Sequence, residues 1–200
     1  MNFINQQDNL LTKEECNTAI DWILKNESVC IEQTGNYAQY EYCTLVDMTS
    51  RMQYISNDGK SVYRLPPNEE FIKRFSPPPL RPIYHAINKL KDTYIDSYPE
   101  VLLHLANWDL EYVRFKWWKP GKHFSEWHSE HDSVENKRVF SFLIYLSDND
   151  CSTMFKRYED VETRAGRGIM FPAYFTHTHK GSICKKGLDR YLISGYYYFT

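Results

Sequence analysis

The sequence predicts an α+β fold that is mainly β, with N-terminal helices packed on one sheet of a β-sandwich or jelly roll. Helical periodicity is confined to the first half of the chain, whereas short β-prone runs with turn signals between them fill the second half. Helices followed by strands, with no linker between them, indicate a single domain over residues 1–200. We expect residues 1–106 to form a supporting region and residues 107–200 to form the β core.

Two amphipathic helices are predicted before residue 100. The first covers about residues 12–26, where Thr12 and Glu15 form a capping box and apolar side chains recur at helical spacing, at Cys16, Ala19, Ile20, Ile23 and Leu24. The second helix ends before Pro99 and carries on one face Ile83, Ile87, Leu90 and Tyr94.

The chain between these helices has a weaker pattern. Residues 28–46 are aromatic and β-branched, and predict one or two strands. The Asp58-Gly59 turn signal in ISNDGKS predicts either a closed hairpin or a mobile loop. A short helix is predicted over residues 66–75, and the SPPPL stretch after it interrupts the helical pattern.

The second half of the chain contains four β-prone runs: WDLEYVRFKWW, RVFSFLIYLS, RGIMFPAYF and DRYLISGYYYF. The stretches between them hold turn-forming residues: KPGK, SDNDCS, AGRG and CKKG. Turns at such regular intervals are typical of a sandwich or a jelly roll.

The composition indicates which partners and which cellular compartment to expect. The chain has 24 basic and 26 acidic residues, a net charge of −2 and no long basic run, so nucleic acid is a disfavoured partner. Its first residues lack the features of a signal peptide, and no apolar run is long enough to span a membrane. Five cysteines without CxxC spacing argue against a disulfide framework or a zinc ribbon and fit a reducing cytoplasm. We therefore expect a cytoplasmic protein with no membrane partner.

The stretch WHSEHD contains a candidate metal site. His128 and Glu130 are two residues apart, so on a β-strand both side chains would lie on the same face. Together with a distant histidine they would make a 2-His-1-carboxylate triad, which binds Fe(II) and leaves positions open for chemistry. Taken alone, however, the motif is better explained as a solvated polar turn.

A downstream segment, FTHTHKGSICKKGLDRYLISGYYYF, strengthens the metal hypothesis. His177 and His179 alternate in the same way, and Arg190 opens an apolar strand eleven residues after His179. A buried arginine needs an anionic partner because an unpaired charge there would be very costly. A dicarboxylate cosubstrate would supply that partner through a bidentate contact. The alternative is an ion pair with an acidic side chain such as Asp148 or Asp160.

Residues 112–199 resemble the catalytic core of the 2-oxoglutarate- and Fe(II)-dependent dioxygenases, in particular the prolyl 4-hydroxylase-like branch and its small bacterial and phage members. The resemblance runs in order through WWKPGKHFSEWHSE, RVFSFLIYLSDND, TMF, GRGIMFP, THTHKG and GLDRYLISGYYYF. The opening LLTKEECNTAIDWI resembles that branch's first helix. The resemblance implies a double-stranded β-helix of the cupin type with a metal-binding β core.

The resemblance also implies roles for individual residues. His128, Glu130 and His179 would be the iron ligands, and His179 is preferred to its neighbour because the family's ligand directly precedes an x-Gly pair, here Lys180-Gly181. The side chains expected to bind or line the pocket for 2-oxoglutarate are Arg190, Tyr145 and Trp118. For Trp118, a direct contact and a packing role are both left open. Arg138 is expected to be structural or to face the substrate rather than to be catalytic.

Three departures from the family pattern affect these expectations. The carboxylate is Glu130, where most of the family has aspartate, and Asp132 is a supporting acceptor or a rival ligand. Asp150-Cys151 replaces a glycine pair that usually precedes the next strand. The CKKGLDR stretch is about one residue longer than the family's usual spacing, which affects the assignment of Arg190.

The activity implied by the resemblance is hydroxylation of a prolyl residue in a protein or peptide, producing succinate and CO2. The implied cofactors are Fe(II), 2-oxoglutarate and O2, with ascorbate left open as a supporting reductant. Residues 47–66 would form a lid over the substrate or, alternatively, a plain mobile hairpin. Two other functions stay open: an oxygenase that acts on a nucleic-acid base or a free amino acid, and a non-catalytic metal-binding β-sandwich. The sequence does not indicate the oligomeric state.

Overall fold

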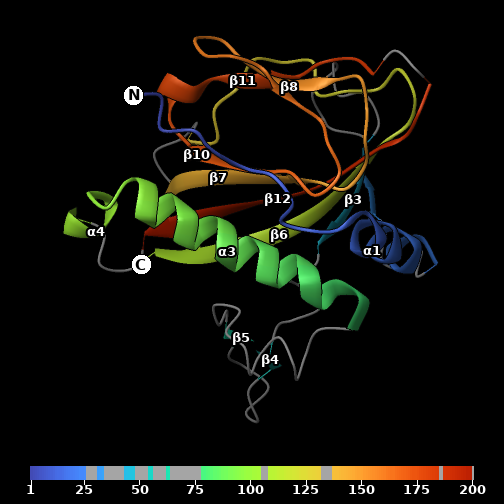
Figure 1. Ribbon diagram of the computed structural model, residues 1–200, viewed down its shortest axis with the longest axis horizontal. Coiled ribbons are helices and arrows are strands. Elements are labelled where there is room, and N and C mark those ends of the chain that lie inside the picture. The colour runs from blue at the N-terminus through green and yellow to red at the C-terminus, as the bar shows by residue number, and fades with distance from the viewer. Residues whose placement is uncertain are drawn as a thin grey trace.

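The computed structural model (Figure 1) describes nine stretches of the chain: residues 1–25, 31–33, 43–47, 54–55, 62–63, 78–104, 108–131, 137–184 and 187–199. The predicted short helix at 66–75 and the Asp58-Gly59 turn lie outside them. Within the described residues, no helix is both long and apolar enough to cross a membrane.

The two predicted amphipathic helices are confirmed. Helix α1 (Lys13–Lys25) begins with the expected capping box, in which the backbone amide of Glu15 donates to Thr12 Oγ1 at 3.2 Å and that of Thr12 donates to Glu15 Oε2 at 2.8 Å. The 3₁₀ turn η3 (Pro78–Leu80) leads into α3 (Arg81–Ser97), whose C-cap is Tyr98, just before Pro99. A short helix, α4 (Val101–His104), follows.

The main sheet is antiparallel and has seven strands within the described part of the chain. Their order is β1 (Asn5–Gln7), β10 (Gly168–Pro172), β7 (Arg138–Tyr145), β12 (Arg190–Phe199), β6 (Trp108–Trp118), β3 (Cys43–Asp47) and β2 (Ile31–Gln33). The four predicted β-prone runs are therefore four adjacent strands of this sheet, and the one or two strands expected within 28–46 are β2 and β3, the latter extending to Asp47.

Two smaller sheets complete the described strands. The first contains β11 (His179–Gly181), β8 (Ser152–Phe155) and β9 (Val161–Glu162), all antiparallel. The second is a two-stranded pair of β4 (Tyr54–Ile55) and β5 (Val62–Tyr63), which flanks the predicted turn as a hairpin would. A 3₁₀ turn, η4 (Phe175–His177), precedes β11.

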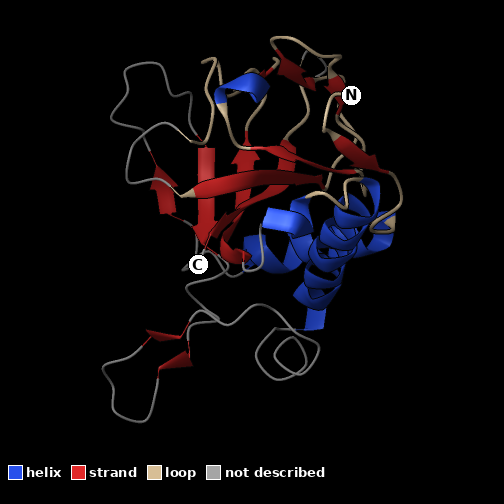
Figure 2. Ribbon diagram, turned by 90° about the vertical axis from the view of Figure 1, so that its left-hand side faces the viewer, coloured by secondary structure: helices blue, strands red, loops and turns tan. Residues whose placement is uncertain are grey.

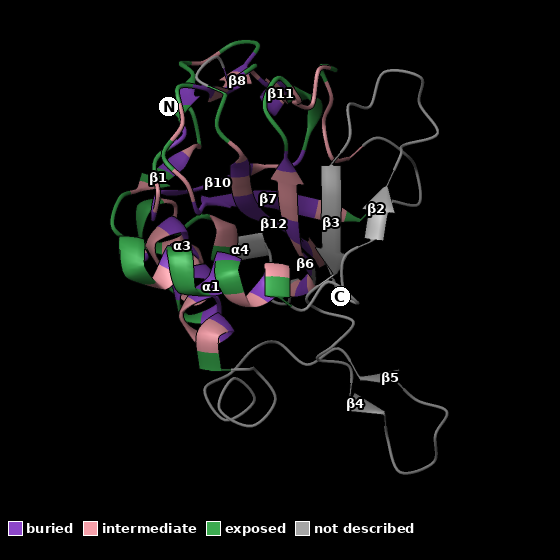
Figure 3. Cartoon of the chain, turned by 90° about the vertical axis from the view of Figure 1, so that its right-hand side faces the viewer, coloured by how far each residue is buried: buried purple, intermediate pink, exposed green. Residues whose placement is uncertain are grey.

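The main sheet lies between two layers, with α1 and α3 on one face and the β11-β8-β9 sheet on the other (Figure 2). Alternation along β7 directs Phe142 and Ile144 towards the helices, and Leu143 and Tyr145 towards the small sheet. The central strands are buried, whereas the outer face of α3 is exposed (Figure 3). This arrangement confirms the predicted jelly-roll core with N-terminal helices packed on one sheet.

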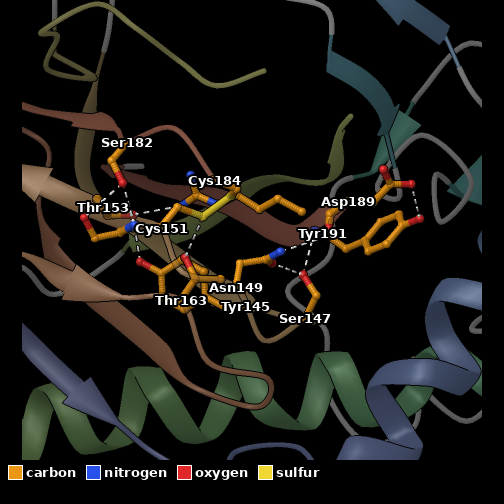
Figure 4. The surroundings of a disulfide bond; sticks show 12 residues. Tyr145, Ser147, Asn149, Cys151, Thr153, Thr163, Ser182, Cys184, Asp189 and Tyr191 are labelled. Carbon is orange, nitrogen blue, oxygen red and sulfur yellow. Dashed lines mark hydrogen bonds between the residues drawn. A yellow bond between two sulfur atoms is a disulfide. The ribbon is translucent and has the colours of Figure 1, made fainter. Parts of the chain in front are cut away.

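The described residues contain one disulfide, between Cys151 and Cys184, which the cysteine spacing did not indicate (Figure 4). The two residues are 33 positions apart, but Cys151 directly precedes β8 and Cys184 lies three residues after β11, its pairing partner. Strand pairing therefore brings together two cysteines that no short motif connects. Since disulfides are uncommon in reducing compartments, the cysteines no longer support a cytoplasmic location.

Candidate metal centre

Two of the three predicted ligands are placed by main-chain pairing between the sheets. His179 is the first residue of β11, and His128 lies in the connection from β6 to β7. An isolated antiparallel bridge joins them, with N–O distances of 3.0 Å and 2.9 Å. His128 and Glu130 were expected on a regular strand, but of the two only His128 takes part in pairing, through this single bridge.

The three predicted ligands converge on one point. Glu130 Oε1 lies 3.4 Å from His128 Nε2 and 3.8 Å from His179 Nε2. One ligand atom from each residue lies within 4.8 Å of the others. Two imidazoles and one carboxylate form the donor set that non-haem Fe(II) oxygenases use, so the residues present fit this ion.

The outer ring nitrogens of both histidines have backbone partners that set their tautomers. His128 Nδ1 lies 3.1 Å from the carbonyl oxygen of Glu126, and His179 Nδ1 lies 3.0 Å from that of His177. Because a carbonyl only accepts hydrogen bonds, Nδ1 carries the proton in each neutral ring. The lone pair of each ring is then on Nε2, which faces Glu130. Metal-binding histidines are commonly oriented in this way.

The surroundings of the triad also favour the protonation states that a metal ion requires. Burial lowers the pKa of His179 to about 3, with the charge of His128 acting in the same direction. Burial alone would raise the pKa of Glu130, but the protonated form of His128, through a hydrogen bond and its charge, and the charge of a protonated His179 lower it to about 2. At neutral pH, His179 is therefore neutral and Glu130 is ionised.

Arg190 lies buried at the start of β12, with 3% of its surface exposed. Its guanidinium carbon lies 5.7 Å from the ring centre of Trp118 and 5.8 Å from that of Tyr145. Its Nη2 contacts Thr153 Oγ1 at 3.5 Å, and Tyr145 donates to the same oxygen at 2.7 Å. At Gly181 a Cβ atom would come within 3.1 Å of Arg190 Nη1, so glycine leaves room for the guanidinium.

The acidic residues proposed as alternative partners of Arg190 have other contacts. Asp148 Oδ2 pairs with Lys13 Nζ at 2.6 Å, and its Oδ1 accepts a hydrogen bond from the backbone amide of Ala165 at 2.8 Å. Asp160 accepts a hydrogen bond from Ser152 Oγ at 3.5 Å.

The triad and Arg190 line the same pocket, which encloses about 410 Å³ including the space open to solvent. The apolar side chains in its wall are Trp118, Phe124, Leu143 and Leu192. The pocket therefore combines a candidate metal-binding triad with a buried cation. This arrangement suits a small dianion that chelates a metal through one end.

The structure thus brings together His128, Glu130, His179, Arg190 and Trp118 in one pocket. Tyr145 is fully buried and reaches Arg190 through its ring and through the hydroxyl of Thr153. Asp132 and most of the predicted lid at 47–66 lie outside the described residues.

Two histidines close to the ligands in sequence have separate roles. His177 ends the turn η4, and its Nε2 contacts the carbonyl oxygen of Asn2 at 2.8 Å. His131 Nδ1 contacts the carbonyl oxygen of Arg138 at 3.0 Å. Neither belongs to the triad of His128, Glu130 and His179.

Sequence reasoning missed several residues of the pocket, among them Thr153 and Lys116. A signal for Thr153 was available, because alternation in CSTMF directs Thr153 and Phe155 to the same buried face. Lys116 lines the pocket two residues before Trp118 on β6, and that spacing also places the two on one face.

Comparison with solved structures yields matches over nearly the whole chain. A Pseudomonas putida prolyl-4-hydroxylase matches with a TM-score of 0.65 at 12% identity, over 100% of this chain and 94% of its own. The viral collagen prolyl hydroxylase of Paramecium bursaria Chlorella virus-1, in complex with 2-oxoglutarate, matches with a TM-score of 0.64 at 14% identity, over 99% and 97%. The chain has the prolyl 4-hydroxylase fold.

A third match with this fold is a Trichoplax adhaerens prolyl hydroxylase bound to a peptide fragment of hypoxia-inducible factor. It has a TM-score of 0.60 at 12% identity, over 100% of this chain and 84% of its own. No family model matches the sequence, and no curated protein matches it. The likeness to the prolyl 4-hydroxylase fold is therefore one of structure, and the activity has to be argued from the site.

Proposed function

We propose that this protein is a 2-oxoglutarate- and Fe(II)-dependent hydroxylase that acts on a prolyl residue of a protein or peptide. The observation that carries the proposal is that the His128, Glu130 and His179 triad shares one pocket with a buried arginine. A non-catalytic scaffold would need neither an oriented set of metal ligands nor a buried cation in the same pocket.

The triad would hold the ferrous ion. His128 and His179 each turn an Nε2 lone pair inward, and Glu130 supplies a negative oxygen between them. Three ligands on one side of the ion leave the remaining positions to cosubstrate and O2. When bound, iron and 2-oxoglutarate supply the oxidising chemistry, in which O2 is consumed, CO2 and succinate are released and a substrate C–H bond is hydroxylated.

Arg190 would bind the far carboxylate of 2-oxoglutarate through its planar guanidinium. Thr153 supports this contact, because its oxygen already accepts hydrogen bonds from Tyr145 and Arg190. The hydroxyl proton of Thr153 is then available for an oxygen of the ligand. Trp118 packs against the guanidinium, and Leu143 and Leu192 exclude water along the wall.

The metal and cosubstrate assignments are tested together with anaerobically prepared protein. Addition of Fe(II) and 2-oxoglutarate should give a visible metal-to-ligand charge-transfer band, and air should then yield succinate. The band should be lost in His179→Ala and kept in His85→Ala, a matched control on the exposed surface of α3. Absence of both the band and succinate from the unaltered protein would contradict the proposal. Iron binding without succinate would indicate a non-catalytic metal protein.

The substrate class rests on the fold match to proteins described as prolyl hydroxylases, one of them bound to a peptide. A library of proline-containing peptides, analysed by mass spectrometry for the gain of one oxygen atom, tests it directly. Oxygen gain on proline supports the proposal. Succinate production stimulated only by nucleosides or free amino acids would assign the same chemistry to another substrate.

A further inference from the structure

The carboxylate of Glu130 has two different environments. Its Oε1 faces the two imidazoles, at 3.4 Å and 3.8 Å, whereas its Oε2 lies 3.7 Å from Nη1 of Arg138. One oxygen is therefore directed to the metal position, and the other is directed to a cation behind it. Only 12% of the Glu130 side chain is exposed.

Arg138 is itself held in place by a second carboxylate. Its Nε donates to Glu111 Oε2 at 2.6 Å and its Nη2 donates to Glu111 Oε1 at 3.1 Å, a bidentate pair. Its guanidinium carbon also lies 4.0 Å from the ring centre of Tyr196. Glu111, Arg138 and Tyr196 come from β6, β7 and β12, which are neighbours in the main sheet, so the sheet fixes the position of the guanidinium.

We propose that Glu111 and Arg138 are positioning residues that orient Glu130 as a metal ligand through its outer oxygen. The proposal rests on the proposed function only in that the triad binds a metal ion. Glutamate has one more rotatable bond than aspartate, so a glutamate ligand loses more side-chain freedom when it binds an ion. A cation that restrains the outer oxygen removes part of that freedom before the ion arrives.

The pair also preserves the negative charge of the site. A lone arginine beside Glu130 would compete with the metal ion by neutralising the carboxylate. Glu111 balances that charge, because Glu111, Arg138 and Glu130 together have a net charge of −1. The outer oxygen is thus restrained while the group as a whole still attracts a divalent cation.

Cobalt affinity provides a test that does not depend on turnover. Co(II) bound to the triad should be measurable from its visible absorption, titrated in competition with a chelator. Arg138→Gln removes the guanidinium and should weaken Co(II) binding by about 10–100-fold, the usual effect of losing an outer-shell partner. Arg164→Gln is the matched control, since Arg164 forms an exposed pair with Glu162 away from the pocket, and it should leave the affinity unchanged.

A second comparison separates positioning from general structural support. Glu130→Asp shortens the side chain by one methylene and moves the carboxylate away from Arg138. Arg138→Gln should therefore weaken Co(II) binding far less in the Glu130→Asp background than in the native one. An equal loss in both backgrounds, or no loss in the native one, would overturn the proposal.

Two further outcomes are interpretable. If Arg138→Gln does not fold, Glu111→Gln tests the same pair, because it leaves the charge of Arg138 unbalanced, and a tenfold or greater loss of Co(II) affinity is expected. Unchanged affinity in Glu111→Gln would contradict the proposal. Failure of the unaltered protein to bind Co(II), or retention of binding in His179→Ala, would instead contradict the proposed function, so the two failures are distinguishable.

Discussion

His128 and His179 are paired through their backbones, each amide donating a hydrogen bond to the carbonyl of the other residue. The centres of their rings consequently lie 4.3 Å apart. The positions of these two side chains are set by the pairing of the β11 segment with the connection that follows β6, and not by contacts between the side chains alone. The candidate metal centre is therefore largely preformed by the fold.

Metal removal should change the stability of the protein without unfolding it. A preformed site binds an ion without a folding step, so the ion stabilises the native state only by mass action, by about 2.7 kcal/mol at 100 times the dissociation constant. We predict that a chelator lowers the melting temperature and that Co(II) restores it. His179→Ala should melt at the same temperature with and without metal, and a metal-dependent shift in that variant would contradict the ligand assignment.

Arg190→Ala should weaken 2-oxoglutarate binding and leave metal binding intact. The substitution removes a charge-assisted contact, and a loss of about 1.5–3 kcal/mol corresponds to an affinity lower by about 10–150-fold. The measurements are the 2-oxoglutarate concentration dependence of the charge-transfer band and the Co(II) affinity of the same variant. Loss of both would indicate disruption of the pocket, and loss of neither would remove Arg190 from the site.

Thr153→Val tests how Tyr145 contributes to the pocket. Valine keeps the shape of threonine but removes the oxygen to which Tyr145 donates, leaving a buried hydroxyl without that partner. We predict a loss of about 1–3 kcal/mol in the free energy of unfolding, together with weaker 2-oxoglutarate binding. Tyr145→Phe removes the donor and should weaken 2-oxoglutarate binding less than Thr153→Val does, because the hydroxyl of Thr153 remains. The reverse order would show that Tyr145 contacts the ligand directly.

The sequence allowed much of the main sheet to be predicted, for physical reasons that particular residues show. The runs that form β6, β7, β10 and β12 are rich in β-branched and aromatic residues and are bounded by turn signals, and the helical spacing around Ile83 and Leu90 extends over enough residues to define a period. The β11-β8-β9 sheet was not predicted because strands of two to four residues are too short to define a period.

Tertiary contacts account for what the sequence did not reveal about the site. The candidate ligands His128, Glu130 and His179 were proposed from resemblance, but the role proposed for Arg138 depends on Glu111, which lies 27 residues earlier on another strand. The contact of Thr153 with Arg190 likewise joins residues 37 positions apart. Spacing along the chain does not indicate such pairs, since they arise from the register of neighbouring strands.

The Cys151–Cys184 disulfide links the small sheet to the segment that leads into Arg190 (Figure 4). It continues the pairing of β8 with β11, in which Thr153 lies opposite Gly181. Thr153 contacts Arg190, and any side chain at position 181 would crowd its guanidinium. Closing a loop of this length lowers the conformational entropy of the unfolded chain, which stabilises the native state by about 3–4 kcal/mol. We therefore predict that Cys151→Ser lowers the free energy of unfolding by about that amount and weakens 2-oxoglutarate binding more than Co(II) binding.

Urea unfolding with and without a thiol reductant provides the measurement for this prediction. The reductant should destabilise the native protein, because two thiols replace the S–S bond, and should leave Cys151→Ser unchanged. Cys16→Ser is the control, since Cys16 is a buried free thiol and forms no disulfide, and its reductant response should match that of the native protein. Equal stability of the native protein with and without reductant would show that the cross-link does not stabilise the fold. Any loss of 2-oxoglutarate binding in Cys151→Ser would then have to come from altered packing at Cys151 alone.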